Sequence, residues 1–444
     1  MKPLLQLAED LATGKTTSQA LIDEALERIA DPNGEGARTI IKVHADRARS
    51  AAKASDQLRK VGVVPSPLAG MPVSLKDLFD EAGEVTTAAT SILAANPPAE
   101  VDCTVVKRIH RSGAIIIGRS NLTEFAYSGL GINRTCGTPR SPWDRETGRI
   151  PGGSSCGAAV SVTDGMAAVA VGSDTGGSVR IPSALCGITG FKSTFGRIPL
   201  DHVHPLSYSL DSAGPLGNTV SCCALLDAIM AGEEPVVPPA REIASLRLAV
   251  PQTLALDDLD DQVANTFEST LSRLAKAGAQ ITEIALTELG EILPCAGILA
   301  AEAYEFHREQ LERVGDRYDP RIRKRILRSE KATAADYVSL MQLRERLIAQ
   351  ANAVTAPFDA ILMPTVAVIP PTIAKLDADD DLYSKMNLLV LRNTMVINLL
   401  NRCALSIPCH EEGEAPVGLM VVGERMNDSK LVSVGLAIES ELKG

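Results

Sequence analysis

Short, nearly uninterrupted apolar runs recur between residues 66 and 250. Four of them are MPVSL (71–75), AIIIG (114–118), MAAVAVG (166–172) and LRLAVP (246–251). Runs of this length with many β-branched residues are typical of strands that are buried on both faces of a sheet. The segments between the runs have helical lengths, so the pattern predicts the alternating layers of an α/β fold.

Helical spacing of apolar residues prevails on both sides of this region. Residues 3–30 predict a surface amphipathic helix, within which TTSQALIDEALERIA begins with a Thr/Ser cap. Residues 260–355 carry several longer helical patterns and predict a helical lobe. FDAILMPTVAVIPP (358–371) then predicts a strand before a Pro-rich loop, and PVGLMVVG (416–423) predicts a last strand. We therefore expect one sheet to enclose the lobe, and we expect the acidic LDADDD (376–381) to form a loop.

Composition and charge narrow the class of protein. Of 444 residues, 45% are hydrophobic and 22% are charged, as is typical of a soluble globular chain. Aromatic residues make up only 3%, so small apolar side chains must do most of the packing. The net charge of -11, without a long basic block, argues against nucleic acid or an anionic membrane as the main partner. The basic run RIRKR (321–325) is expected to be a solvated helix face.

Signals for secretion, membrane insertion and metal binding are not apparent in the sequence. Acidic residues interrupt MKPLLQLAEDLATGK, where a secretory peptide needs an apolar stretch, and no later window reaches about 18 uncharged apolar residues. The nine cysteines include no C-x-x-C pair, which favours buried free thiols in a reducing compartment. We therefore expect a cytoplasmic protein that uses no metal and no cofactor.

The most unusual stretch is RIPGGSSCGAAVSV (149–162). Its segment GSSCG matches G-x-S-x-G, which would make Ser155 the elbow nucleophile of an α/β-hydrolase. That elbow requires an apolar strand leading into the turn, whereas the preceding PWDRETGRIPGG is polar and rich in Gly and Pro. The chain has only six histidines, none in a recognisable setting for a triad. The elbow interpretation is therefore disfavoured.

A second Gly/Ser-rich turn follows in GSDTGGSVRIP (172–182). Residues 157–164 suit a short helix and 166–172 a strand, an arrangement that brings both turns to one edge of the sheet. Two serine hydroxyls could then meet, and a Gly-Gly-Ser turn can direct backbone N–H groups toward a developing oxyanion. The alternative is that both are ordinary tight turns in which glycine supplies unusual dihedral angles.

A nucleophilic serine also needs a base, and neither turn contains histidine. Lys76 directly follows the apolar run 72–75, so it would emerge from the end of a buried strand. A desolvated lysine can be neutral near pH 7 and accept a proton. The alternative is an ordinary surface or ion-paired lysine.

Several segments together resemble the motifs of the amidase signature family. They are GMPVSLKDLFD, PGGSSCGAAVSV, GSDTGGSVRIPSALCGITGFK, SLDSAGPL and PVGLMVVGER, in this order along the chain. The resemblance is strong from about 65 to 220 and looser toward both ends. It implies an amide hydrolase with a Ser–cisSer–Lys triad, and a single α/β/α domain over 1–444 with a central mixed sheet covered by helices. The motifs place the catalytic core at 66–225 and a helical cover of the substrate pocket at 255–355.

The family's catalytic roles map onto three residues of this chain. Ser178, the last residue of DTGGS, resembles the nucleophile, and Ser154, the first serine of GGSS, resembles the bridging serine on a cis peptide. Lys76 takes the place of the base. Ser155 is then expected to be structural, and Cys156 departs from the Gly or Ser usual in relatives.

The resemblance also implies how the substrate is held. The backbone N–H groups of Thr175, Gly176, Gly177 and Ser178 would form an oxyanion hole. The segment TEFAYSGLGIN (123–133) would supply pocket residues, including Ser128 and Gly129, and its glycines suggest a small acyl pocket. Arg325 resembles a substrate-binding arginine of the glutamine-handling amidotransferase relatives, and a solvated arginine is the alternative.

The expected partner is a small-molecule amide, with no direct contact to nucleic acid or membrane and with a homodimer left open. A second function remains possible from the motifs: the amidase subunit of a tRNA-dependent amidotransferase, which hydrolyses glutamine beside a partner.

Overall fold

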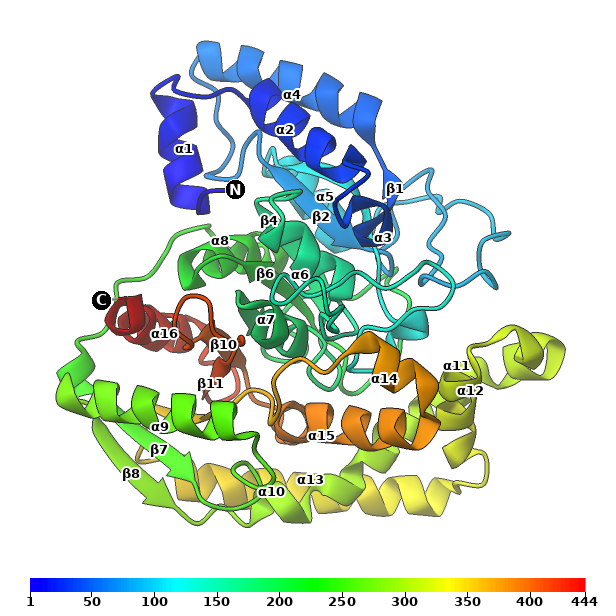
Figure 1. The fold of residues 1–444 in the computed structure, drawn as a ribbon, viewed down its shortest axis with the longest axis vertical. Helices are drawn as coiled ribbons and strands as arrows, with labels where there is room; N and C mark the ends of the chain where they lie inside the picture. The colour runs from blue at the N-terminus through cyan, green and yellow to red at the C-terminus, as the bar shows by residue number, and fades with distance from the viewer. Residues whose placement is uncertain (444) are drawn as a thin grey trace.

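A large mixed β-sheet runs through the molecule (Figure 1), as seen in a computed structural model that describes residues 1–443. Its strands are β1 (Ile40–Val43), β2 (Pro72–Lys76), β3 (Ile115–Ser120), β4 (Val169–Ser173), β5 (Thr189–Lys192), β6 (Ala213–Gly217), β7 (Arg247–Pro251), β8 (Gln280–Ile284), β9 (Ala360–Pro364), β10 (Ala404–Pro408) and β11 (Gly418–Val422). They are ordered β1-β3-β2-β4-β6-β5-β10-β11-β9-β7-β8 across the sheet. The described residues thus form a single α/β domain, as expected.

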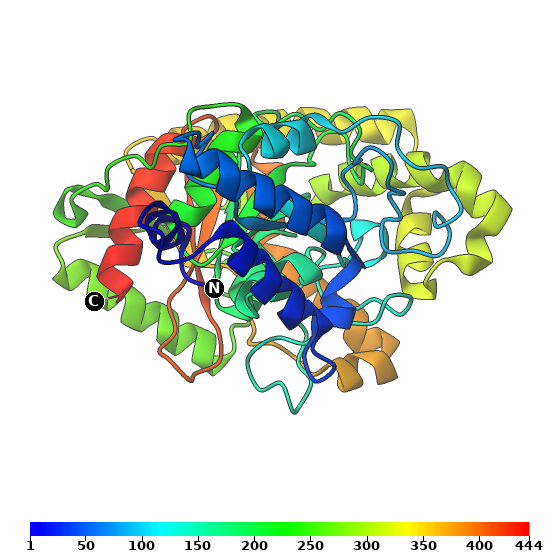
Figure 2. The ribbon, with the colours of Figure 1, turned by 90° about the horizontal axis from the view of Figure 1, so that it is seen from above.

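Helices flank this sheet (Figure 1). They are α1 (Leu4–Ala12), α2 (Ser18–Ala30), α3 (Gly36–Thr39), α4 (Ala45–Lys60), α5 (Thr104–Arg111), α6 (Cys156–Thr163), α7 (Arg180–Cys186), α8 (Val220–Ala231), α9 (Asp261–Lys276), α10 (Glu288–Glu291), α11 (Ala296–Val314), α12 (Pro320–Ile326), α13 (Ala334–Thr355), α14 (Ile373–Ala378), α15 (Asp380–Leu399) and α16 (Asp428–Lys443). The helices α1, α2 and α4 lie at the end of the molecule that carries β1, whereas α9 and α13 lie at the opposite end with β7 and β8 (Figure 1). Seen from above, α16 and the α11–α12 region lie on opposite sides (Figure 2).

The central strands follow the predicted apolar runs within a few residues. β2, β3 and β4 are buried along their whole lengths and pair in parallel, β2 with both neighbours. Burial on both faces explains why these strands read as continuous apolar runs rather than as alternating patterns. Because β2 and β4 are parallel neighbours, the residues at their carboxyl ends, Lys76 and Ser173, meet at the same edge of the sheet.

The prediction of one continuous helix over residues 3–30 is wrong, because the segment forms two helices, α1 and α2. Gly14 adopts a positive φ of 72° after α1, and the chain turns before α2 begins. The predicted Thr/Ser cap is confirmed, because the Thr17 side chain accepts a hydrogen bond from the Ala20 N–H at 3.1 Å. The helical spacing of apolar residues therefore continues across the turn at Gly14, so the spacing alone does not reveal that the helix is interrupted.

The segment predicted as a helical lobe holds α9, α11, α12 and α13 but also contains a strand. β8 pairs in parallel with β7 at the edge of the sheet. Its sequence, QITEI, alternates in character and is mostly exposed, so it gave no apolar run. The strands predicted over 358–371 and 416–423 are confirmed as β9 and β11, and both belong to the same sheet as β7.

The loop predicted for 376–381 is wrong, because this segment ends α14 and begins α15. The Asp379 side chain accepts hydrogen bonds from the Asp381 and Leu382 N–H groups, both at 2.9 Å, and so caps α15. Asp380 and Asp381 then lie in the first turn, where the helix dipole stabilises negative charge. The acidic cluster is thus a helix start.

Candidate active site

Lys76 lies at the carboxyl end of β2 with no exposed surface. Its Nζ is 2.8 Å from Ser154 Oγ, 2.9 Å from Ser155 Oγ and 2.8 Å from Ser173 Oγ. All three partners are neutral hydroxyls, and within residues 1–443 no carboxylate pairs with the ammonium. Burial lowers the pKa of Lys76 to about 7, although nearby acidic groups oppose the shift. The site therefore favours a lysine that can be neutral near physiological pH.

Ser154 and Ser173 each place a hydroxyl where it can give a proton to Lys76. The Ser155 hydroxyl can donate to the Ser173 carbonyl at 3.3 Å. In the described part of the chain, the Ser154 hydroxyl has no hydrogen-bond partner other than Lys76. When the lysine is neutral, this hydroxyl can donate to its lone pair. The Gly153–Ser154 peptide bond is cis, as the resemblance implied.

Ser178 lies in the second turn, which the backbone joins to the first. The Ser155 N–H donates to the Ser178 carbonyl at 3.3 Å, so the predicted meeting of the two turns is confirmed. The Ser178 side chain is buried. Its Oγ forms no hydrogen bond with any residue of 1–443, so a direct Ser154–Ser178 hydrogen bond is not formed here. The structure thus brings Lys76 and Ser154 into contact and places Ser178 in the adjoining turn.

Asp174 organises this second turn. Its Oδ1 accepts from the Gly177 N–H at 2.8 Å, and both of its carboxylate oxygens accept from the Arg180 guanidinium at 3.0 Å. Asn398 of α15 also donates to Oδ1, at 2.9 Å. Burial alone raises the pKa of Asp174, but the charge and hydrogen bonds of Arg180 hold it well below its usual range. A buried, fully paired carboxylate therefore fixes the turn that carries Ser178.

The predicted oxyanion donors are not equivalent. The Gly177 amide is already engaged by Asp174, whereas the amides of Thr175, Gly176 and Ser178 donate no hydrogen bond to residues 1–443. The φ of Gly177 is 132°, and an added Cβ would lie 2.1 Å from Thr394 Oγ1, so only glycine fits there. Gly177 therefore shapes the turn, and its neighbours retain free donors.

A small pocket opens beside Ser178, with about 10 Å³ of free space. It is lined by Ala126, Tyr127, Ser128, Thr175, Gly176, Ser178, Leu206, Leu299, Arg325, Leu391 and Met395. Apart from the turn that carries Ser178, its walls come from the segment 126–128, from Leu206 and from the helices α11, α12 and α15. This space accommodates about one water molecule. A larger cavity of about 690 Å³ shares Arg325, Leu391 and Met395 with it.

The three predicted substrate contacts have different surroundings. Ser128 lines the pocket, and its Oγ contacts Asn387 Oδ1 at 2.9 Å. Gly129 lies behind the wall, where its N–H donates to Asn387 Oδ1 and its carbonyl accepts from the Gly153 N–H, both at 2.8 Å. Arg325 lines the pocket with its guanidinium 4.6 Å from the centre of the Tyr127 ring, and its Nη1 is buried without a hydrogen-bond partner. Gly129 thus holds the wall in place, while Ser128 and Arg325 face the pocket.

The RIRKR run is only partly the solvated face that the sequence predicted. The Arg321 side chain is nearly buried and forms ion pairs with Asp377 and Asp380. Arg325 faces the pocket. Lys324 is exposed, as predicted.

Sequence reasoning missed several residues that build the site. Ser173 holds Lys76, and the Asp174–Arg180 pair fixes the turn. A carboxylate before a Gly-Gly turn with an arginine six residues later is a signal that could have indicated this pair. The contribution of α15 had no local signal. Ser155, predicted to be structural, contacts the lysine directly, and burial raises the pKa of the Cys156 thiol to about 12, which disfavours a thiolate there.

Within residues 1–443, no helix combines the length and the apolar character needed to cross a membrane.

Comparisons with known proteins identify the class of this chain. It is 35% identical to the 2-amino-5-chloromuconic acid deaminase of Comamonas testosteroni, over 98% of this chain and 95% of that protein. It is 33% identical to a glutamyl-tRNA(Gln) amidotransferase subunit from Roseiflexus castenholzii, over 99% and 96% of the two chains. A crystal structure of an amidase superposes with a TM-score of 0.88 at 30% identity, covering 99% of both chains.

These relatives define a hydrolase that acts on C–N bonds. The sequence profile of the Amidase family matches residues 20–432, and the chain belongs to the amidase signature family. The resemblance seen in the sequence motifs is confirmed.

Proposed function

We propose that this protein hydrolyses a linear carboxamide or urea-type C–N bond through an acyl-enzyme on Ser178. Ser154 relays protons, and Lys76 acts as the base. The observation that carries the proposal is the fully buried Lys76, which contacts three hydroxyls and no carboxylate. Burial without a counter-charge favours the neutral amine, and a neutral amine beside a serine is a base.

The proposed chemistry uses the Lys76–Ser154 contact and also requires Ser178 Oγ to reach Ser154 when substrate is bound. Neutral Lys76 takes the Ser154 proton while Ser154 takes the Ser178 proton, and Ser178 Oγ forms a bond to the substrate carbonyl carbon. The resulting oxyanion accepts hydrogen bonds from the free amides of Thr175, Gly176 and Ser178. When the C–N bond breaks, the relay returns the proton to the leaving nitrogen. Water then attacks the ester by the same relay, which releases the acid and restores Ser178.

Arg325 is proposed to bind a carboxylate of the substrate. Its Nη1 is buried and unpartnered beside the pocket of Ser178, and a carboxylate would satisfy it with a charge-assisted hydrogen bond. The Comamonas relative is named for acting on an acid, which supports an anionic substrate here. Ser128 would contact the same substrate.

A second candidate function is that of an amidotransferase component that hydrolyses glutamine beside a partner. It is supported by the relatives of that name at about one-third identity over nearly the whole chain. The buried site does not distinguish between the two functions, since either uses the same three residues.

Steady-state turnover by the purified chain tests the proposal. Ammonia release is measured with short aliphatic, carboxylate-bearing, aryl and urea-derived amides and with glutamine. We expect turnover of at least one amide other than glutamine, and its loss in Ser178→Ala. Hydrolysis of glutamine alone, and only after a partner protein and tRNA are added, would replace this proposal with the second candidate.

A further inference from the structure

A separate groove lies between α12 and α15, outside the pocket of Ser178. It encloses about 130 Å³. One wall carries Lys324, Arg325 and Arg328, and the other carries Ser384 and Asn387. Arg325 lines both this groove and the pocket of Ser178, so the two spaces adjoin at its guanidinium.

The charge in this groove is not balanced by the protein. Lys324, Arg325 and Arg328 form no ion pair with residues 1–443. Asp380 also lines the groove, but Arg321 already pairs with it at 2.6 Å. Three unpaired cations thus converge in a chain whose net charge is -11.

The polar groups of the groove are mainly hydrogen-bond donors. Asn387 Oδ1 already accepts from Ser128 Oγ and from the Gly129 N–H, which leaves its Nδ2 donor without a partner in the described residues. The Nη1 of Arg325 is likewise unpartnered. A donor-lined space with excess positive charge is complementary to an anion rather than to a neutral or cationic group.

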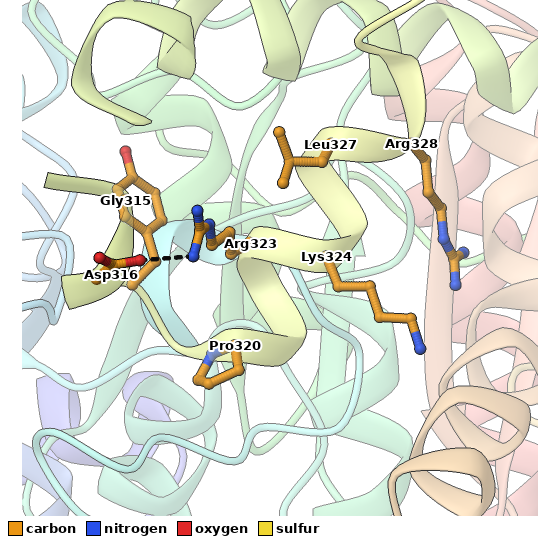
Figure 3. A pocket seen from close by; sticks show the side chains of 8 residues that line it. Gly315, Asp316, Pro320, Arg323, Lys324, Leu327 and Arg328 are labelled. Carbon is orange, nitrogen blue, oxygen red and sulfur yellow. Dashed lines mark hydrogen bonds and ion pairs between the residues drawn. The ribbon is translucent and has the colours of Figure 1, made fainter. Parts of the chain in front are cut away.

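The two exposed cations, Lys324 and Arg328, border both this groove and a neighbouring pocket of about 520 Å³. Figure 3 shows Lys324 and Arg328 projecting to the same side of α12, away from the Arg323–Asp316 ion pair. Arg323 lies on the same helix and carries the same charge but is neutralised at 2.8 Å by Asp316. The chain therefore offers a matched control on the other side of the helix.

We propose that this groove binds a second anionic group of the substrate, so that the preferred substrate carries two carboxylates. One carboxylate binds Arg325 at the junction, and the other lies between Lys324 and Arg328. This inference rests on the proposed function, in which an acyl group sits on Ser178 beside Arg325. It deepens that function by naming an organic dianion as the substrate class.

Direct binding tests the groove independently of catalysis. Calorimetry at constant low ionic strength compares glutarate and adipate with valerate and hexanoate, which have the same lengths but one carboxylate. We expect the dicarboxylates to bind about tenfold more tightly, as one further charge-assisted contact would give. Lys324→Ala and Arg328→Ala should each remove most of that difference without weakening the monocarboxylates, and Arg323→Ala should leave it unchanged.

Three results would overturn the inference. They are equal binding of mono- and dicarboxylates by the unmodified chain, an equal loss in Arg323→Ala, and binding of inorganic phosphate as tightly as glutarate. The same titrations with Ser178→Ala separate the groove from the proposed function, because that variant should keep the dicarboxylate preference without hydrolysis. Dicarboxylate binding by a chain that hydrolyses no amide would therefore still support the groove proposal. Absence of the dicarboxylate preference would leave the proposed function of Lys76, Ser154 and Ser178 unaffected.

Discussion

At the scale of single residues, the site depends on the charge state of Lys76. Desolvation removes much of the stabilisation of an ammonium group, and three hydroxyls replace only part of it. Its pKa of about 7 lies well below the usual lysine value of 10.5. The proposed base therefore needs no histidine, and the three hydroxyls around Nζ can hydrogen-bond to it in either protonation state.

The first prediction concerns this base. The rate kcat/KM should rise with pH through an apparent pKa near 7 and level off above it, because only deprotonated Lys76 accepts the proton. Lys76→Ala should lower kcat/KM by roughly 10²–10⁴-fold, which is the usual contribution of general base catalysis. Lys76→Arg keeps the charge but stays protonated at neutral pH, so it cannot accept a proton and should be equally inactive. Near-native turnover in Lys76→Ala would instead make the lysine structural.

The second prediction concerns the nucleophile. A fluorophosphonate should attach to Ser178, because its hydroxyl borders the pocket while Ser154 and Ser155 are buried against Lys76. Peptide mass mapping locates the label, and Ser178→Ala should take up none. Label on Ser155 or Cys156, with Ser178 unmodified, would contradict the assignment.

At the scale of elements, a buried ion pair sets the turn between β4 and α7. Asp174 and Arg180 have no exposed side-chain surface, and the pair also contacts Asn398 of α15. Removing one partner of such a pair leaves an uncompensated charge in the interior. The turn, the helix after it and α15 are thus tied together at one point.

The third prediction follows from this pair. Asp174→Asn should lower the free energy of unfolding by about 3–5 kcal/mol, since Arg180 then stays buried without a counter-charge. Denaturant unfolding measures the change, with Glu24→Gln as the control. Glu24 and Arg28 form an exposed helical pair, so this control should change stability by less than about 1 kcal/mol. Similar losses in both variants would contradict the role given to Asp174.

The elements of the site differ in how far the sequence predicts them. The apolar runs predict β2 and β4, and with them the place where Lys76 emerges, because strands buried on both faces need continuous apolar residues. The edge strand β8 and the helix α15 are not predicted. An edge strand needs no apolar run. α15 reaches the site through tertiary contacts, since Leu391 and Met395 line the pocket and Asn398 donates to Asp174. Local patterns predict the three residues of the proposed triad, whereas the pocket walls depend on packing between distant segments.

At the scale of the whole molecule, the distribution of charge matters more than its sum. The net charge is -11, yet the unpaired cations Lys324, Arg325 and Arg328 gather at one groove. Screening at physiological salt limits the repulsion from distant acidic residues to about 8 Å. The local cations therefore dominate what a small anion meets beside the site, while the overall charge governs contact with a large polyanion.

The last prediction distinguishes the effect of the local cations from the effect of the overall negative charge. A tRNA spans many Debye lengths and would meet the acidic surface as well as the groove, so the chain alone should show no measurable tRNA binding at physiological salt. Filter binding across a salt series measures this, with a basic RNA-binding protein as the positive control. If the chain is self-sufficient, addition of tRNA should also leave its turnover of small amides unchanged. Tight binding of tRNA by the isolated chain, or turnover that requires tRNA, would favour the amidotransferase function, because the acidic surface would then not exclude the polyanion.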